Sequence, residues 1–203
     1  MHPNPSFRQE TEQQHIEFAK ERGFGTLIVN AGEHPLASHV PFILKEDVAE
    51  FHLVRSNPIV RLLKSPVAAM IAVTGPDAYI SPDWYGVDNQ VPTWNYVAVH
   101  VRGTLSLRPS EELQPHLIEL SKEFERRLNK VPWKIDKMDA EPLARLMRII
   151  VPARLEIDSV EGTWKLNQNK DESARQGAIE GLEHSGVGSE IAMLRNLMKR
   201  ITE

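Results

Sequence analysis

The sequence predicts an α+β fold, in which a mostly antiparallel β-barrel is flanked by helices and followed by a C-terminal helical pair. Six or seven strand-like segments are met mainly by short turns, which favours an antiparallel barrel over a doubly wound sheet. Helical periodicity is confined to the two ends of the chain and to one long insert. We therefore expect one domain over residues 1–170 and a helical tail packed on it over residues 171–203.

The elements follow in the order helix, strands, helical insert, last strand and terminal helices. A polar helix over 10–23 ends at Gly23, a residue suited to a left-handed cap. Alternation predicts a strand over 35–44, where Pro41 cannot donate to a ladder and so marks an edge or a bulge. In the strand over 94–107, Gly103 marks a bulge or a close backbone approach. Further strands are predicted over 25–30, 47–55, 67–73, 77–81 (after a break at Gly75 and Pro76) and 153–161, and helices over 57–64, from Ser110 to Leu128, around 140–149, and over about 171–183 and 190–201.

Composition excludes several classes of function. The 203 residues include no cysteine, so disulfides, thiolate metal sites and a cysteine nucleophile are excluded. A net charge of −4 gives no basic footprint of a polyanion partner. The N-terminus lacks the apolar region of a signal peptide, and the longest apolar run is too short to span a bilayer. We expect a cytoplasmic protein with no membrane contact.

No familiar catalytic or metal motif is present. The sequence has no GxGxxG, P-loop or GxSxG pattern, and its eight histidines form no HExxH or HxH. His39 and His52 could face each other across paired strands, but no third ligand is evident nearby. His100 fits an ordinary strand position. We expect neither a metal site nor a catalytic residue.

The strongest local signal is HLVRSNP at residues 52–58. A strand ends in Arg55, Ser56 and Asn57, and Pro58 opens a helix immediately afterwards. Helix N-termini favour anions, and the arginine adds a charged fork, so a phosphate could bind there. The alternative is that Asn57 only caps the helix while Arg55 is solvated.

Two further polar segments could line a ligand. SHVPF (38–42) comes one hairpin earlier and could lie beside HLVRSNP, with backbone groups freed at Pro41. KLNQNK (165–170) offers carboxamides that suit the edge of a pyrimidine-like ring. A bulged edge strand and a polar turn are the structural alternatives.

Aromatic residues gather in one stretch. Residues 79–96 hold all three tyrosines and two of the four tryptophans. A core spreads its aromatics through the sequence, whereas a site for a flat ligand collects them. We expect Tyr79, inside a strand, to be structural.

The terminal helices could resemble a helix-turn-helix, because Arg195, Lys199 and Arg200 form a basic face. An apolar stripe on the same helix favours docking instead, and the preceding helix is acidic. Direct reading of DNA by this pair is therefore doubtful.

Taken together, SHVPF, HLVRSNP, GPDAYISPDWY, VPTWNYVAVHVRG and KLNQNK resemble the PaiB family of FMN-binding negative transcriptional regulators. They cover most of the chain from about residue 35 to 170 in the family's order. HLVRSNP stands where HxARANP is usual, and KLNQNK where KLSQNK is usual, with the charged and amide positions kept. The resemblance implies a split β-barrel homodimer with FMN near the subunit interface, like the pyridoxamine phosphate oxidase group.

The resemblance also implies which residues bind FMN. Arg55 would bind the phosphate beside Ser56 and Asn57, and the backbone of residues 38–40 would line the ring. The full expected set is Ser38, His39, Val40, His52, Leu53, Arg55, Ser56, Asn57, Trp94, Tyr96, Lys165, Asn167 and Gln168. The alternatives to a regulator are a flavin-dependent oxidoreductase on the same scaffold and a haem-binding module with His39, His52 or His100 as axial ligand.

Overall fold

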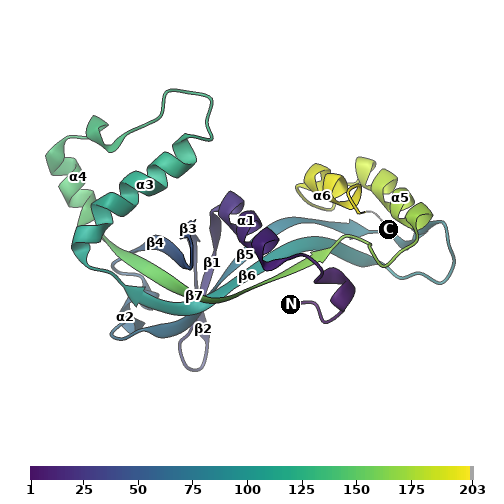
Figure 1. The fold of residues 1–203 in the computed structure, drawn as a ribbon, viewed down its shortest axis with the longest axis horizontal. Coiled ribbons are helices and arrows are strands. Elements are labelled where there is room, and N and C mark those ends of the chain that lie inside the picture. Colours follow the sequence, from purple (N-terminus) through teal and green to yellow (C-terminus); the bar gives the residue numbers. More distant parts are fainter. Residues whose placement is uncertain (202–203) are drawn as a thin grey trace. The chain divides into compact units, whose positions relative to one another are not determined.

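The computed structural model describes residues 1–201, which form two compact units (Figure 1). The first unit contains Met1–His15, Thr74–His100 and the described residues from Glu161 onward, and the second contains Ile16–Val73 and Val101–Val160. Three long strands contribute to both units: β5 (Val67–Ile80), β6 (Thr93–Leu107) and β7 (Ile150–Lys165). No helix among the described residues is long and apolar enough to cross a membrane.

The strands form one sheet with the order β2-β1-β5-β6-β7-β4-β3, and β8 (Gly188–Ser189) pairs with β5. The remaining strands are β1 (Phe24–Asn30), β2 (Pro35–Pro41), β3 (Ile43–Lys45) and β4 (Val48–Val54). The neighbours β1–β2, β1–β5, β3–β4, β4–β7 and β5–β8 are antiparallel. The predicted mostly antiparallel α+β architecture is confirmed.

The core of the second unit follows the period of two expected for strands with one buried face. Leu27, Phe51, Leu105 and Leu155, from four different strands, are fully buried. A Cβ added to Gly103 would lie 1.8 Å from the Glu156 carbonyl oxygen, so β6 and β7 approach closely there. The predicted close backbone approach is confirmed.

The segment 35–44 forms two strands, interrupted at Phe42. Val40, Phe42 and Leu44 are buried on one face, as the alternation predicts, and β2 is an edge of the sheet. The predicted break at Gly75 and Pro76 is wrong, because both residues lie inside the continuous strand β5. Proline's fixed φ is compatible with extended chain, and β8 pairs with β5 only at Asp77 and Ala78.

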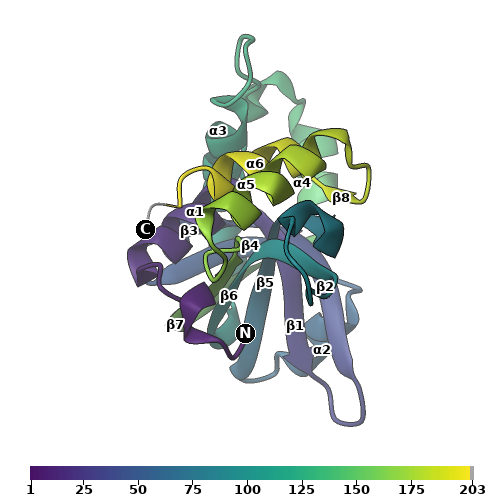
Figure 2. The ribbon, with the colours of Figure 1, turned by 90° about the vertical axis from the view of Figure 1, so that its right-hand side faces the viewer.

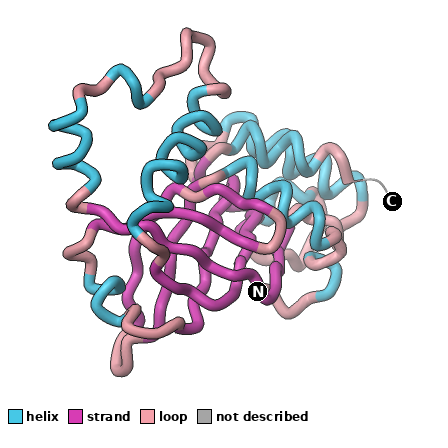
Figure 3. The backbone as a smooth tube through the Cα atoms, turned by 60° about the vertical axis from the view of Figure 1, so that its left-hand side comes forward, coloured by secondary structure: helices cyan, strands magenta, loops and turns pink. Residues whose placement is uncertain are grey.

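Six α-helices are described: α1 (Glu12–Arg22), α2 (Pro58–Leu62), α3 (Leu113–Glu125), α4 (Ala140–Met147), α5 (Glu172–Gly181) and α6 (Ile191–Met198). Gly23 has φ +58 and ends α1 as a left-handed cap, as predicted. The insert between β6 and β7 carries α3 and α4 (Figure 3). Ser110 opens a 3-10 turn, η3 (Ser110–Glu112), rather than capping α3, and Leu128 lies beyond the end of α3 and is 51% exposed.

The first unit also contains three short 3-10 turns, η1 (Pro5–Phe7), η2 (Pro82–Tyr85) and η5 (Leu182–His184). A further 3-10 turn, η4 (Ile135–Lys137), lies in the second unit. In the first unit α5 and α6 lie side by side (Figure 2). Of the stripe expected on α6, Leu194 is fully buried and Ile191 and Leu197 are half-buried, and Met198, outside that stripe, is also fully buried. Arg195 joins the two helices by donating to the Ile179 carbonyl (3.0 Å) and to Glu183 (2.9 Å).

Candidate functional site

In the second unit, the edge strand β2 is joined to the loop that follows β4. Asn57 Nδ2 donates to Ser38 Oγ at 3.0 Å, and Asn57 Oδ1 accepts from the Ile59 N–H at 2.9 Å. One side chain therefore caps α2 and also ties its first turn to β2. The expectation that SHVPF lies beside HLVRSNP, with Asn57 as cap and Pro58 as first helical residue, is confirmed.

Arg55 is exposed and oriented by the backbone at the start of β7. Its Nε donates to the Arg148 carbonyl at 3.1 Å and its Nη2 to the Ile150 carbonyl at 3.3 Å. Arginine has five N–H donors in a rigid fork, so these two bonds fix the guanidinium and leave donors for an anion. Ser56 is exposed beside it. The Arg55 side chain is therefore held in place by the backbone and still has hydrogen-bond donors for a ligand.

The other expected residues of this unit differ in what they offer. The side chains of Val40 and Leu53 are each 2% exposed and pack in the core, so only their backbone could face a ligand. His39 is exposed and stacks on Phe24, with ring centroids 6.3 Å apart. Because β2 forms a ladder with β1 alone, the far side of its backbone at residues 38–40 belongs to the sheet edge.

His52 does not face His39, because β4 pairs with β3 and β7 rather than with β2. Instead its Nδ1 lies 3.3 Å from Nε2 of His116 on α3. Burial lowers the pKa of His52, and burial together with His52 lowers the pKa of His116 to about 4. No group of three or more metal-ligating side chains occurs among residues 1–201.

Sequence reasoning missed His116. The residue lies three positions after Leu113 and four before Leu120, on the buried stripe of α3. A histidine at that helical spacing was a visible signal, but its partner on β4 lies 64 residues away.

In the first unit, Lys165, Asn167 and Gln168 end β7 and form the following turn. The Lys165 ammonium donates to Thr93 Oγ1 and lies 5.8 Å from the Phe7 ring centre, and burial followed by the charge of Lys170 lowers its pKa. The Gln168 side chain closes its own turn, accepting from the Leu166 N–H at 2.7 Å and donating to the Trp164 carbonyl.

Asn167 is 1% exposed and adopts φ +63. Its Oδ1 lies 3.4 Å from the Tyr85 hydroxyl, which donates to it. Its Nδ2 is buried without a hydrogen-bond partner among the described residues. Buried donors are rarely left unpaired, so this amide is a candidate to donate to a ligand.

The aromatic stretch divides into two groups. Tyr85 is buried, and Trp84 packs against α5 so closely that a Cβ on Gly181 would lie 2.2 Å from its ring. These two residues are structural. Trp94 is 45% exposed, meets Tyr79 edge to face at 6.3 Å, and shares the outward face of β6 with half-buried Tyr96. Only this second group is available to stack on a flat ligand.

In the second unit, the donors of Arg55 beside Ser56 and the β2 edge suit a phosphorylated, hydrogen-bonding ligand, and comparisons with known proteins agree. The family described as "Putative FMN-binding domain" matches residues 1–159. The Bacillus subtilis "Protease synthase and sporulation protein PAI 2" is 32% identical over 186 residues, covering 89% of this chain and 88% of that protein.

Solved structures resemble the fold at low sequence identity. The FAD and heme binding protein from Mycobacterium smegmatis gives a TM-score of 0.58 at 15% identity, covering 90% of this chain and 82% of that one. A conserved hypothetical protein from Mycobacterium tuberculosis gives 0.53 at 14% identity, covering 91% and 96%. These likenesses support the split-barrel fold, and the family match fixes the cofactor as FMN. The chain belongs to the FMN-binding family that includes the PAI 2 protein.

Proposed function

We propose that this protein is a homodimeric, FMN-binding negative transcriptional regulator of the PaiB type. The observation that carries the flavin site is the bond between Asn57 and Ser38. It joins the loop after β4 to the edge strand β2, two segments that share no ladder. The joined segments present a charged fork, a hydroxyl and free backbone edge within one unit.

The phosphate end of FMN is assigned to Arg55 and Ser56. A guanidinium recognises phosphate by paired, charge-assisted hydrogen bonds, and the carbonyls of Arg148 and Ile150 already hold this one in place. Helix α2 has five residues, so its dipole contributes little and the arginine supplies the binding energy.

The ring end is assigned to the backbone of residues 38–40 in the second unit. Within the first unit alone, Trp94 and Tyr96 share one face of β6, Lys165 ends β7 and Asn167 lies in the turn that follows. Gln168 would act only by shaping the turn that holds Asn167. No catalytic residue is assigned, since flavin carries its own redox chemistry.

The dimer is proposed from the outward face of β1, β2 and β5 in the second unit. Thr26, Ile28, Met70 and Ala72 are half-buried there, and Phe24 is 53% exposed at its margin. The register places Thr26 opposite Ala72 and Ile28 opposite Met70, so this apolar surface is contiguous. A second copy would cover it, as contiguous apolar surface of this kind favours association.

A regulatory role is supported by the PAI 2 relative, whose name refers to sporulation and protease synthesis. Direct DNA reading by the terminal helices is not supported, because Arg195 is engaged by Ile179 and Glu183. A flavin-dependent oxidoreductase is the second candidate, since a shared fold does not fix function. Consumption of reduced nicotinamide by the FMN-loaded protein would favour that candidate.

Two flavins test the site. FMN and riboflavin share the ring and differ in the phosphate, so Arg55→Ala should weaken FMN roughly 10- to 150-fold, as expected for a lost charged hydrogen bond of about 1.5–3 kcal/mol. Riboflavin should bind the native protein weakly and respond little. Arg108→Ala removes a partly buried arginine paired with Glu112 and should leave both affinities unchanged.

The ratio of the two affinities is the decisive measurement, taken by flavin fluorescence. Arg55 also supports the backbone of β7, and loss of that support would weaken both flavins equally. An unchanged ratio would therefore remove Arg55 from the phosphate site. Sedimentation of the FMN-loaded protein as a monomer at micromolar concentration would reject the dimer.

A further inference from the structure

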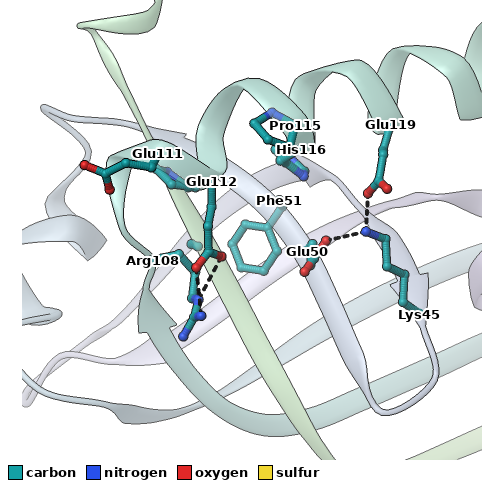
Figure 4. Close-up of a pocket in the computed structure, with 11 residues that line it drawn as sticks. Lys45, Glu50, Phe51, Arg108, Glu111, Glu112, Pro115, His116 and Glu119 are labelled. Atoms are coloured by element: carbon teal, nitrogen blue, oxygen red, sulfur yellow. Dashed lines mark hydrogen bonds and ion pairs between the residues drawn. The ribbon is translucent and has the colours of Figure 1, made fainter.

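A separate pocket of about 310 Å³ lies between α3 and the strands β4 and β7 of the second unit (Figure 4). Its apolar lining comes from Phe51, Pro115, Pro152 and Ala153. The volume is at the lower end of the roughly 300–1,000 Å³ typical of ligand pockets. None of the residues that line the pocket belongs to the set expected to bind FMN. The nearest member of that set is His52, which contacts the lining residue His116.

The lining is rich in carboxylates. Four glutamates line the pocket with two cations, Lys45 and Arg108: Glu50, Glu112 and Glu119, and Glu111, whose carboxylate points away from the others in Figure 4. Lys45 lies between Glu50, at 2.8 Å, and Glu119, as Figure 4 shows.

The remaining cations are also engaged. Arg108 is bidentate to Glu112, at 3.1 and 2.9 Å. Behind the lining, Arg154 donates to Glu50 at 2.7 Å from the position directly opposite on β7. An anion would therefore meet only cations that are already paired, whereas a cationic N–H would meet carboxylate oxygens that can accept further hydrogen bonds.

A buried, unpartnered nitrogen gives the pocket a directional contact. His116 lines it and is 6% exposed. Its Nε2 is engaged by His52 Nδ1 at 3.3 Å, while its Nδ1 is buried with no hydrogen-bond partner in the part of the chain that the structure describes. When Nε2 carries the ring proton and donates to His52, Nδ1 is an acceptor that requires an N–H.

We propose that this pocket binds a small organic cation, whose N–H donates to His116 Nδ1 and whose charge is balanced by Glu50 and Glu119. The ammonium displaces no existing cation, because each carboxylate can accept further hydrogen bonds beside those from Lys45 and Arg154. The apolar lining receives the hydrocarbon part of the ligand. The site is independent of the flavin and offers the protein a second ligand.

Three isosteric probes test the charge requirement on the full-length, FMN-loaded protein. Benzylammonium, benzyl alcohol and benzoate share a ring and differ in the charge of one group. Calorimetry should show saturable, millimolar binding of benzylammonium alone. The ¹⁵N resonance of His116 Nδ1 should shift with benzylammonium and stay unchanged with benzoate.

Two variants test the residues. His116→Leu keeps similar bulk without the acceptor and should weaken benzylammonium about fivefold, the effect of one ordinary hydrogen bond. Glu119→Gln removes a half-exposed charge and should weaken it roughly two- to fivefold. Glu33→Gln, on an exposed turn outside the pocket, is the matched control and should have no effect.

Equal binding of the three probes, or preference for benzoate, would overturn the proposal, as would absence of benzylammonium binding. If His116→Leu fails to fold by circular dichroism, the probe series and Glu119→Gln still decide. Arg55→Ala should leave benzylammonium binding intact, so failure of the flavin site and failure of this pocket are distinguishable.

Discussion

The bond between Ser38 and Asn57 gives the sharpest test of how the flavin site is assembled. Ser38→Ala removes the link between β2 and the loop after β4, while Asn57 can still accept from the Ile59 N–H. Asn57→Ala removes both the link and the helix cap. The double variant then measures whether the two side chains act through each other.

The magnitudes follow from the two contacts. The link, a partly buried hydrogen bond of 3.0 Å, should contribute about 0.5–1.5 kcal/mol, with the lower half favoured because water can reach Asn57 Nδ2 once Ser38 is truncated. Loss of an Asn cap costs about 0.5–2 kcal/mol, so Asn57→Ala should lower the free energy of unfolding by about 1–3.5 kcal/mol. In a chain of 203 residues each kcal/mol lowers Tm by roughly 2–4 °C.

Urea unfolding of the native protein, both single variants and the double variant forms a complete cycle. We expect a coupling free energy of about 0.5–1.5 kcal/mol between the positions. FMN binding should weaken in Ser38→Ala more than in a surface control such as Ser185→Ala. If the two substitutions changed the free energy of unfolding strictly additively, the contact would contribute nothing to stability and this account of the site would be refuted.

Two further predictions concern packing and pH. Gly181→Ala places a Cβ 2.2 Å from the Trp84 ring and should cost about 1–3 kcal/mol by overpacking, whereas Gly186→Ala, where nothing lies within 4 Å, should be nearly neutral; thermal unfolding followed by tryptophan fluorescence compares them. The pKa of His116 is lowered to about 4, so the folded protein favours the neutral form of this side chain. Its contribution to the free energy of unfolding is complete above the unfolded pKa near 6.5 and is lost as pH falls towards 4. The full contribution is on the order of 3 kcal/mol. The difference in urea midpoint between native protein and His116→Leu should therefore shrink from pH 7 to pH 4.5, and a constant difference would contradict the prediction.

Local chemistry made parts of this structure predictable. Asn57 and Pro58 begin a helix because one residue accepts from a free N–H and the other has no N–H to satisfy. Gly23 and Gly103 were recognised because each position needs a residue without a Cβ. Such preferences depend on only a few neighbouring residues, so they can be predicted from the local sequence.

Where the prediction was wrong, tertiary contacts outweighed local preference. Gly75 and Pro76 were predicted to interrupt the strand, yet both are buried within β5. Leu128 continued the apolar spacing of α3, but the chain leaves the helix earlier, where Glu125 accepts from Lys130 and from the Trp133 N–H. Periodicity cannot report such loop contacts, because they pair residues outside any regular repeat.

The aromatic stretch shows the same limit for the site. Its composition indicates a flat ligand, but it cannot separate Trp94, which is exposed, from Trp84, which packs on the glycines of α5. That distinction depends on Gly177 and Gly181, almost a hundred residues later in the chain. The candidate ligand faces could be listed from the sequence but could be selected only from the fold.

Assembly of the phosphate end depends on strands that share no ladder. β2 begins the sheet order and β4 lies near its other end, but Phe42 alone separates β2 from β3, which pairs with β4, so the chain path itself brings β2 close to the loop after β4. The Asn57 amide adds a side-chain link by donating to Ser38, with the donor that the helix cap leaves unused. Each motif would persist without the other, whereas a ligand that contacts both requires them to be held together. Ser38→Ala, which leaves the helix cap and Arg55 untouched, therefore tests how the two segments are held together, whereas Arg55→Ala tests the phosphate contact itself.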